Sequence, residues 1–206
     1  MAHMLSESSC GALDIITGPM FSSKTTTLIG RLLSESEIGF NVLYINSSTD
    51  ERNEENFSTH NPLYKESPFS KKIKCLKVDC VLEIMNIAEK FVVIGIDEAQ
   101  FFDDLYIGVK WLVDGIHKHV IVAGLNGTFK REPFGQILQI DPLSDTHTKL
   151  TAWCLECSKS RKRTPAPFTH RILTGGPVKQ SGGIDKYIPV CRRCYEFLNR
   201  DSEWMK

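Results

Sequence analysis

The fold of this chain is decided by the stretch Gly18-Pro19-Met20-Phe21-Ser22-Ser23-Lys24-Thr25. This stretch nearly matches the phosphate-loop pattern, in which backbone amides surround phosphate groups, a lysine contacts the β- and γ-phosphates and a hydroxyl binds magnesium. One position departs from the pattern, because Ser23 replaces the glycine expected before the lysine. A serine there crowds the phosphate-binding amides or restricts the backbone. The alternative is an ordinary strand-to-helix turn with a surface lysine.

The apolar residues around this loop predict alternating strands and helices. An apolar run at residues 13–16 stops before Gly18, and leucines recur at helical spacing from Lys24 onward. By the same criteria we expect strands at residues 42–45, 91–96 and 119–123, helices at residues 81–88 and 105–116, and a mobile polar surface segment at residues 46–74. This alternation predicts a parallel α/β sheet over the first ~150 residues.

Two acidic residues follow the apolar run 91–96. A fully apolar strand is expected to be buried on both faces, which places Asp97 and Glu98 at its carboxyl end. We expect Asp97 to hold magnesium together with Thr25, and Glu98 to accept a proton from a hydroxyl that attacks the γ-phosphate. Two alternatives stay open: a pair of acids that begins a helix, and the glutamate of a helicase-like ATPase.

Composition and charge exclude several classes of protein. The chain has 206 residues, of which 41% are hydrophobic and 24% are charged, as in globular proteins. Its 25 basic residues balance its 25 acidic residues, which argues against nucleic-acid binding. No apolar run approaches the ~20 residues of a membrane helix. The start Met1-Ala2-His3-Met4 lacks the features of a secretory signal and suggests a vector remnant, so we expect a cytoplasmic protein.

The cysteines predict a metal site. Two C-x-x-C pairs, Cys154 with Cys157 and Cys191 with Cys194, suit a structural zinc ion held by four thiolates; disulfides or redox chemistry are the alternative. Such a metal would close the base of a long loop. The three other cysteines lack paired spacing and are expected to be unligated thiols: Cys10, Cys75 and Cys80.

A change of composition near Leu150 predicts a domain boundary. Paired cysteines, a basic run and two Gly-Gly steps follow it. We therefore expect a disordered N-terminus at residues 1–12, a nucleotide-binding α/β domain at 13–150, a zinc-binding domain at 151–197 and a tail at 198–206. The basic run, Lys159 with Arg161, Lys162 and Arg163, is expected to be a solvated surface rather than a nucleic-acid site.

Three separated motifs resemble those of type II thymidine kinases, the cytosolic and poxviral kind. They are Gly18-Pro19-Met20-Phe21, Asp97-Glu98-Ala99-Gln100-Phe101-Phe102, and Gly127-Thr128-Phe129 with Pro133-Phe134. Together with the cysteine pairs they occur in the family's order between Leu13 and Tyr195. The resemblance implies a RecA-like α/β domain with a small ribbon-like zinc domain and a lasso loop. It also implies transfer of the γ-phosphate of ATP to the 5′-hydroxyl of thymidine, with deoxyuridine as a possible substrate.

The same resemblance implies roles for individual residues. Glu98 would be the general base, Lys24 and Arg52 would act on the phosphates, and Thr25, Asp97 and Asp50 would hold Mg²⁺. Contacts to ATP are implied for Gly18, Pro19, Met20, Phe21, Ser22, Ser23, Lys24, Thr25 and Thr26, and contacts to thymidine for Met20, Phe101, Leu125, Phe129, Phe134, Thr169, Gly182, Gly183 and Tyr187. Of the thymidine contacts, Tyr187 is expected at the 3′-hydroxyl of the sugar.

The resemblance further implies a homotetramer, with a dimer as the alternative, that is inhibited by the end-product triphosphate dTTP. One departure lies beside the expected substrate pocket, where Asn126 replaces the family's usual aspartate. Two other functions stay open. A RecA-type ATPase would hydrolyse ATP in response to DNA or RNA, and a zinc-clipped binding module would not bind ATP.

Overall fold

A sheet of six parallel strands lies at the centre of the computed structural model, which describes residues 10–50, 73–172, 183 and 185–205. The strands stand in the order β3-β2-β4-β5-β1-β6. Their bounds are β1 Ala12–Thr17, β2 Val42–Ser47, β3 Lys74–Val78, β4 Val93–Asp97, β5 His119–Gly124 and β6 Thr146–Lys149. The predicted α/β class and parallel sheet are confirmed.

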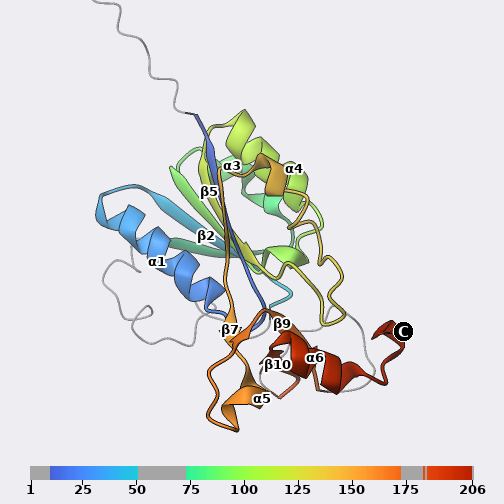
Figure 1. Cartoon of the computed structure of the whole chain (residues 1–206). Coiled ribbons are helices and arrows are strands. Elements are labelled where there is room, and N and C mark those ends of the chain that lie inside the picture. The colour runs from blue at the N-terminus through green and yellow to red at the C-terminus, as the bar shows by residue number, and fades with distance from the viewer. Residues whose placement is uncertain (1–9, 51–72, 173–182, 184, 206) are drawn as a thin grey trace, which may run out of the picture.

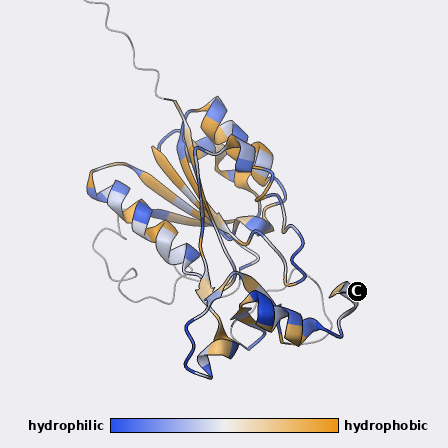
Figure 2. Cartoon of the chain, viewed as in Figure 1, coloured by the Kyte–Doolittle hydropathy of each residue, from blue (hydrophilic) through white to orange (hydrophobic). Residues whose placement is uncertain are grey.

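Helices cover both faces of this sheet (Figure 1). Helix α1, Lys24–Glu37, packs on one face through Leu28, Leu32 and neighbouring residues. The other face carries 3₁₀-helix η2 Val81–Ile84, α3 Met85–Ala88, and α4 Leu105–Lys110, which continues as the π-helical turn η4 Trp111–Gly115. Further 3₁₀ turns are η3 Ala99–Phe101 and η5 Asp141–Leu143. The four inner strands, β1, β2, β4 and β5, are thus a buried middle layer, and Figure 2 shows hydrophobic residues along them.

Side-chain alternation assigns the strand residues to the two faces. On β1, Leu13 and Ile15 join the cluster under α3 and α4, whereas Ile16 joins the cluster under α1. Close approach of α1 requires a glycine on β4, because a Cβ atom at Gly95 would lie 2.4 Å from the Leu32 side chain. Tight packing of this kind fixes where α1, and therefore the loop before it, stands relative to the sheet.

Two strands of the central sheet were not expected from the sequence. Strand β6 contains only Thr146, His147, Thr148 and Lys149, and β3 has lysines at two of its five positions. Both lie at the edges of the sheet, where one side of the strand faces solvent and apolar residues are not required. The polar composition of β3 and β6, which prevented their prediction from the sequence, is therefore a consequence of their position at the edges.

The residues after Leu150 form two small antiparallel sheets. Strand β7 Ala152–Trp153 pairs with β8 Pro165–Ala166, and β9 Phe168–Arg171 pairs with β10 Tyr187–Val190. Helices α5 Leu155–Ser158 and α6 Arg192–Asn199 and the 3₁₀ turn η6 Glu203–Met205 complete this part. Its core cluster uses only residues from 152 onward. We propose on this ground that a C-terminal unit, residues 152–205, begins close to the boundary expected from composition.

No helix within the described residues combines the length and apolar character needed to cross a membrane.

Candidate active site

The phosphate-loop sequence connects β1 to α1. Two side chains within it donate to the same carbonyl oxygen: Lys24 Nζ and Ser22 Oγ each lie 2.8 Å from the oxygen of Pro19. Both side chains are buried. Because its ammonium group already lies against the loop backbone, Lys24 is close to where phosphates would bind the loop amides. The structure therefore places Lys24 and the helix N-terminus of α1 together, as a phosphate loop requires.

The departure at Ser23 has a conformational cost. Ser23 has φ 63° and ψ 29°, which is the left-handed region. Glycine enters this region without penalty, whereas a residue with a Cβ atom pays about 1–2 kcal/mol. The glycine of the phosphate-loop pattern is thus replaced at a position whose backbone suits glycine. Ser23 itself is exposed.

Replacing Ser23 with glycine is expected to raise the free energy of unfolding by about 1 kcal/mol and the melting temperature by about 2–4 °C, because the left-handed strain is removed. ATP should also bind more tightly, since the loop amides no longer adjoin a serine side chain. Thermal unfolding and calorimetric ATP titration measure the two effects. Ser34→Gly on exposed helical backbone is the matched control and should destabilise the protein. A Ser23→Gly protein with unchanged stability and ATP affinity would contradict this account.

Asp97 lies at the centre of a hydrogen-bond network at the end of β4. Its Oδ1 atom accepts from Thr25 Oγ1 at 3.2 Å and from the Glu98 amide at 2.9 Å, and its Oδ2 atom accepts from Tyr44 Oη at 2.8 Å. Burial, and secondly the charge of Glu98, raise the pKa of Asp97 to about 6, against the effect of these three donors. A bound cation would relieve this unfavourable burial of charge.

The donor set at this point fits magnesium. The hydroxyl of Thr25 and the carboxylate of Asp97 are oxygen ligands of the kind Mg²⁺ prefers, and they meet beside the phosphate loop. The third expected ligand, Asp50, is fully buried and accepts from Asn46 Nδ2 at 3.0 Å. Asn46 stands opposite Asp97 in the register of β2 and β4. All three residues therefore gather at the carboxyl edge of the sheet.

Glu98 occupies a strained backbone position directly after β4. It has φ 48° and ψ 39°, in the left-handed region, and its side chain is buried. Gln100 Nε2 donates to Glu98 Oε2 at 2.6 Å, and Gln100 Oε1 accepts from the Leu125 amide at 2.8 Å. Strained residues persist only where the surroundings fix them, and they are frequent at active sites. Gln100 thus links the candidate base to the loop after β5.

Sequence reasoning did not single out Gln100. The available signal was a polar amide within the otherwise apolar run Ala99–Phe102, since Gln100 is fully buried and a buried amide needs partners for both of its ends. Its two partners, Glu98 and Leu125, come from different loops. No local sequence pattern predicts the contact with Leu125.

Five of the residues expected to contact a nucleoside have identified side-chain or backbone contacts, which lie in three places. Phe101 and Phe134 meet edge to face, with ring centroids 5.9 Å apart. The Met20 amide donates to Thr169 Oγ1 at 3.0 Å, which joins the phosphate loop to β9. Phe129 contacts Trp204 and Arg171 in the C-terminal unit.

The lasso positions are described only in part. Tyr187 is buried on β10, and its amide donates to the Gly183 oxygen at 3.1 Å. Burial raises the pKa of Tyr187, which Arg171 partly offsets, so its hydroxyl stays protonated at neutral pH. The Leu125 amide donates to Gln100 Oε1, and Gln100 in turn contacts Glu98. Thr26 is on the first turn of α1. Arg52 and Gly182 lie outside the described residues.

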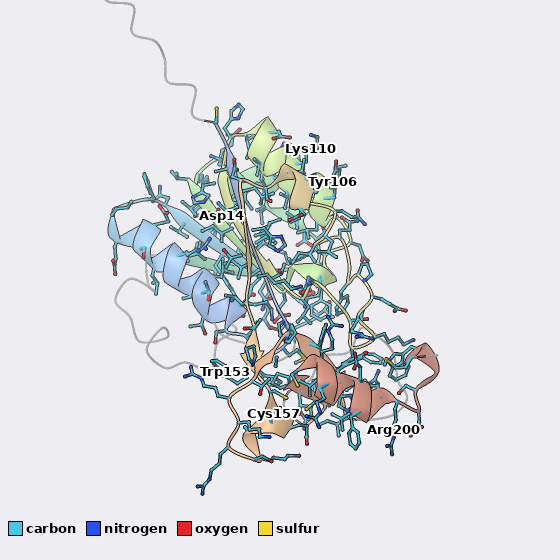
Figure 3. All side chains as sticks on the ribbon, viewed as in Figure 1. Asp14, Tyr106, Lys110, Trp153, Cys157 and Arg200 are labelled. Atoms are coloured by element: carbon cyan, nitrogen blue, oxygen red, sulfur yellow. The ribbon has the colours of Figure 1, made fainter. Side chains whose placement is uncertain are left out.

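The four paired cysteines form one cluster. All four Sγ atoms of Cys154, Cys157, Cys191 and Cys194 lie within 4.8 Å of one another, and none of the four forms a disulfide. Cys157 Sγ is 3.8 Å from that of Cys191 and 3.7 Å from that of Cys194. Cys157, labelled in Figure 3, lies on α5, and its sulfur is close to that of Cys194 on α6. Four thiolates with this proximity suit a structural zinc ion with no open position, and the cluster is compatible with such an ion.

Comparison with known proteins identifies the family. The family model described as thymidine kinase matches residues 11–195. The chain is 40% identical over 185 residues to human "Thymidine kinase, cytosolic", covering 90% of this chain and 73% of that protein. It is 38% identical over 191 residues to the thymidine kinase of fowlpox virus, covering 91% and 98%, and 39% identical over 194 residues to "Thymidine kinase a" of Arabidopsis thaliana, covering 90% and 75%. With a phosphate loop, an Asp-Glu pair at the end of β4 and a four-cysteine cluster in place, this chain belongs to the thymidine kinase family.

Proposed function

We propose that this chain transfers the γ-phosphate of ATP to the 5′-hydroxyl of thymidine, giving thymidine monophosphate and ADP. It is a nucleoside kinase and serves the salvage of pyrimidine deoxynucleotides. The observation that carries the proposal is the position of Glu98, a buried carboxylate held by Gln100 directly beside the Asp97–Thr25 pair and the phosphate loop.

Glu98 acts as the general base in this proposal. The 5′-hydroxyl loses its proton to Glu98 as its oxygen forms a bond to the γ-phosphorus, and the bond from that phosphorus to the bridging oxygen of ADP breaks. Lys24 and the loop amides from Gly18 to Thr26 hold the phosphates, and Arg52 offsets charge on the transferred group. Thr25, Asp97 and Asp50 would hold Mg²⁺, which would neutralise phosphate charge.

The nucleoside is proposed to lie between the phosphate loop and the C-terminal unit. Met20, Phe101, Leu125, Phe129 and Phe134 offer apolar surface for a thymine ring and its methyl group, and Thr169, Gly182, Gly183 and Tyr187 offer polar contacts from the C-terminal unit. The link from Met20 to Thr169 supports this arrangement, because it brings the phosphate loop against β9. Zinc would stabilise the C-terminal unit without taking part in the chemistry.

The remaining family properties are proposals as well. They are a homotetramer, feedback inhibition by dTTP, and a cytosolic location, the last supported by the names of the human and bovine relatives.

The decisive assay determines which compound stimulates ATP consumption. ADP formation is measured with thymidine, with deoxyuridine, with single-stranded DNA, and with no addition. Thymidine-dependent ADP formation that matches thymidine monophosphate one to one is expected. Hydrolysis stimulated by DNA and indifferent to nucleosides would instead support a RecA-type ATPase.

Replacing Gln100 with leucine is expected to lower kcat by about 10- to 100-fold, because a base that is no longer held drifts from its reactive position. The free energy of unfolding should also fall by about 1–3 kcal/mol, since the Leu125 amide loses its buried acceptor. Steady-state kinetics and thermal unfolding measure the two effects. The matched control is Gln139→Leu at an exposed position. Full activity in the Gln100→Leu enzyme would show that Glu98 needs no such support.

A further inference from the structure

The loop after β5 forms a tight turn around Thr128. The Thr128 amide donates to the Glu132 oxygen at 2.9 Å, and the Arg131 amide donates to the Thr128 oxygen at 2.9 Å. Arg131 has a left-handed φ of 67°, a strained value for arginine. Phe129 lies at the centre of this turn and is only 8% exposed. A strained turn with a buried aromatic ring requires contacts from elsewhere to hold it.

Those contacts come from three elements of the C-terminal unit. Tyr195 Oη, on α6, donates to the Phe129 oxygen at 2.6 Å. The guanidinium of Arg171, on β9, lies 5.0 Å from the centre of the Phe129 ring. Trp204, on η6, meets the same ring edge to face at 5.4 Å. Phe129 is thus held at its backbone oxygen by α6 and at its ring by β9 and η6.

The residues after Phe129 are held by the same elements. Arg131 stacks on the Tyr195 ring, with its guanidinium 4.4 Å from the ring centre, and donates to Met205 Sδ at 3.5 Å. Lys130 Nζ lies 5.6 Å from the centre of the Trp204 ring. In Figure 1 the loop after β5 descends toward α6 and the C-terminal end. Tyr195 and Trp204 therefore each contact the loop at two residues.

We propose that Tyr195 and Trp204 are positioning residues that set the affinity for thymidine by orienting Phe129. The inference rests on the proposed function, in which the Phe129 ring lines the nucleoside pocket. An aromatic ring contributes stacking energy only when its orientation toward the base is suitable. Tyr195 directly follows Cys194, so the same short helix carries one of the zinc ligands and the hydrogen bond to Phe129.

The test compares Michaelis constants for thymidine and for ATP in three variants. Tyr195→Phe removes one hydroxyl, Trp204→Ala removes the ring beside Phe129, and Trp204→Phe keeps a ring there. Trp153→Ala is the matched control, because Trp153, labelled in Figure 3, is also an exposed tryptophan of the C-terminal unit beneath a basic side chain, with the Arg163 guanidinium 4.1 Å from the centre of its ring. Zinc content and melting temperature are measured for every variant.

Tyr195→Phe and Trp204→Ala are each expected to raise KM for thymidine about 3- to 10-fold, with KM for ATP unchanged, as one lost hydrogen bond or aromatic contact predicts. Trp204→Phe should recover most of the loss, and Trp153→Ala should show none. An active wild type whose two variants keep their thymidine KM, or raise both KM values equally, overturns the positioning role alone. A wild type that phosphorylates no nucleoside overturns the proposed function and this inference with it.

Discussion

Replacing Glu98 with glutamine is expected to lower kcat for thymidine phosphorylation by about 10²- to 10⁴-fold, the usual contribution of a general base. The amide keeps the shape of the side chain and still accepts from Gln100 Nε2, so the loop should keep its structure. The glutamine amide cannot, however, accept the proton of the 5′-hydroxyl. KM for ATP should change by less than about threefold, because the lost interaction is made only during reaction. Steady-state kinetics with both substrates measures the effect.

The control accounts for the loss of one negative charge from the chain as a whole. Glu89→Gln removes one carboxylate at an exposed position and should leave kcat unchanged. In Glu98→Gln the pKa of Asp97 should fall, since the charge of Glu98 contributes to raising it. An enzyme that retains more than a tenth of its kcat after Glu98→Gln would exclude Glu98 as the base.

Removing one cysteine ligand is expected to abolish zinc binding and unfold the C-terminal unit. In small zinc domains the metal supplies on the order of 10 kcal/mol of folding free energy, more than so small a core provides. Cys191→Ser should therefore lose its zinc, expose the core cluster around Tyr195 and Val190, and lose thymidine binding. Binding of ATP to the phosphate loop should weaken less, since the loop connects β1 to α1 and its hydrogen bond to the C-terminal unit joins the Met20 amide to Thr169 Oγ1.

Metal analysis, thermal unfolding and separate titrations with thymidine and ATP test this expectation. The control is Cys80→Ser, because serine suits the start of η2 and Cys80 is not part of the four-cysteine cluster. Wild-type protein should contain one zinc ion per chain. A Cys191→Ser protein that melts like the wild type and binds thymidine normally would show that the cluster has no structural role.

Most of the nucleotide-binding fold could be predicted because its signals are local. The strand ending at Thr17, the loop at residues 18–25 and the helix from Lys24 are contiguous, and the apolar run before Asp97 reports a strand buried on both faces. The expected helix at 105–116 is present as α4 followed by a π-helical turn. The one at 81–88 is present as η2 followed by α3, each of only four residues.

The contacts that complete the candidate site were beyond sequence reasoning because they join loops far apart in the chain. Gln100 bridges Glu98 and Leu125, and Thr169 accepts from the Met20 amide. A phenylalanine at position 129 gives the same local pattern whether it packs in the core or against a tail. Only the folded chain shows that its neighbours are Arg171 and Trp204.

The sequence by itself determined the chemistry available to this protein: a phosphate loop, two acids at the end of a buried strand and two pairs of thiols, each encoded within a few adjacent residues. The tertiary structure decided which of these groups meet and what holds them. It brought Asp97 to Thr25, assembled the four thiols within 4.8 Å, and set Phe129 against the C-terminal unit. The physical reason is that residue type fixes what a side chain can do, whereas packing of distant segments fixes where it stands.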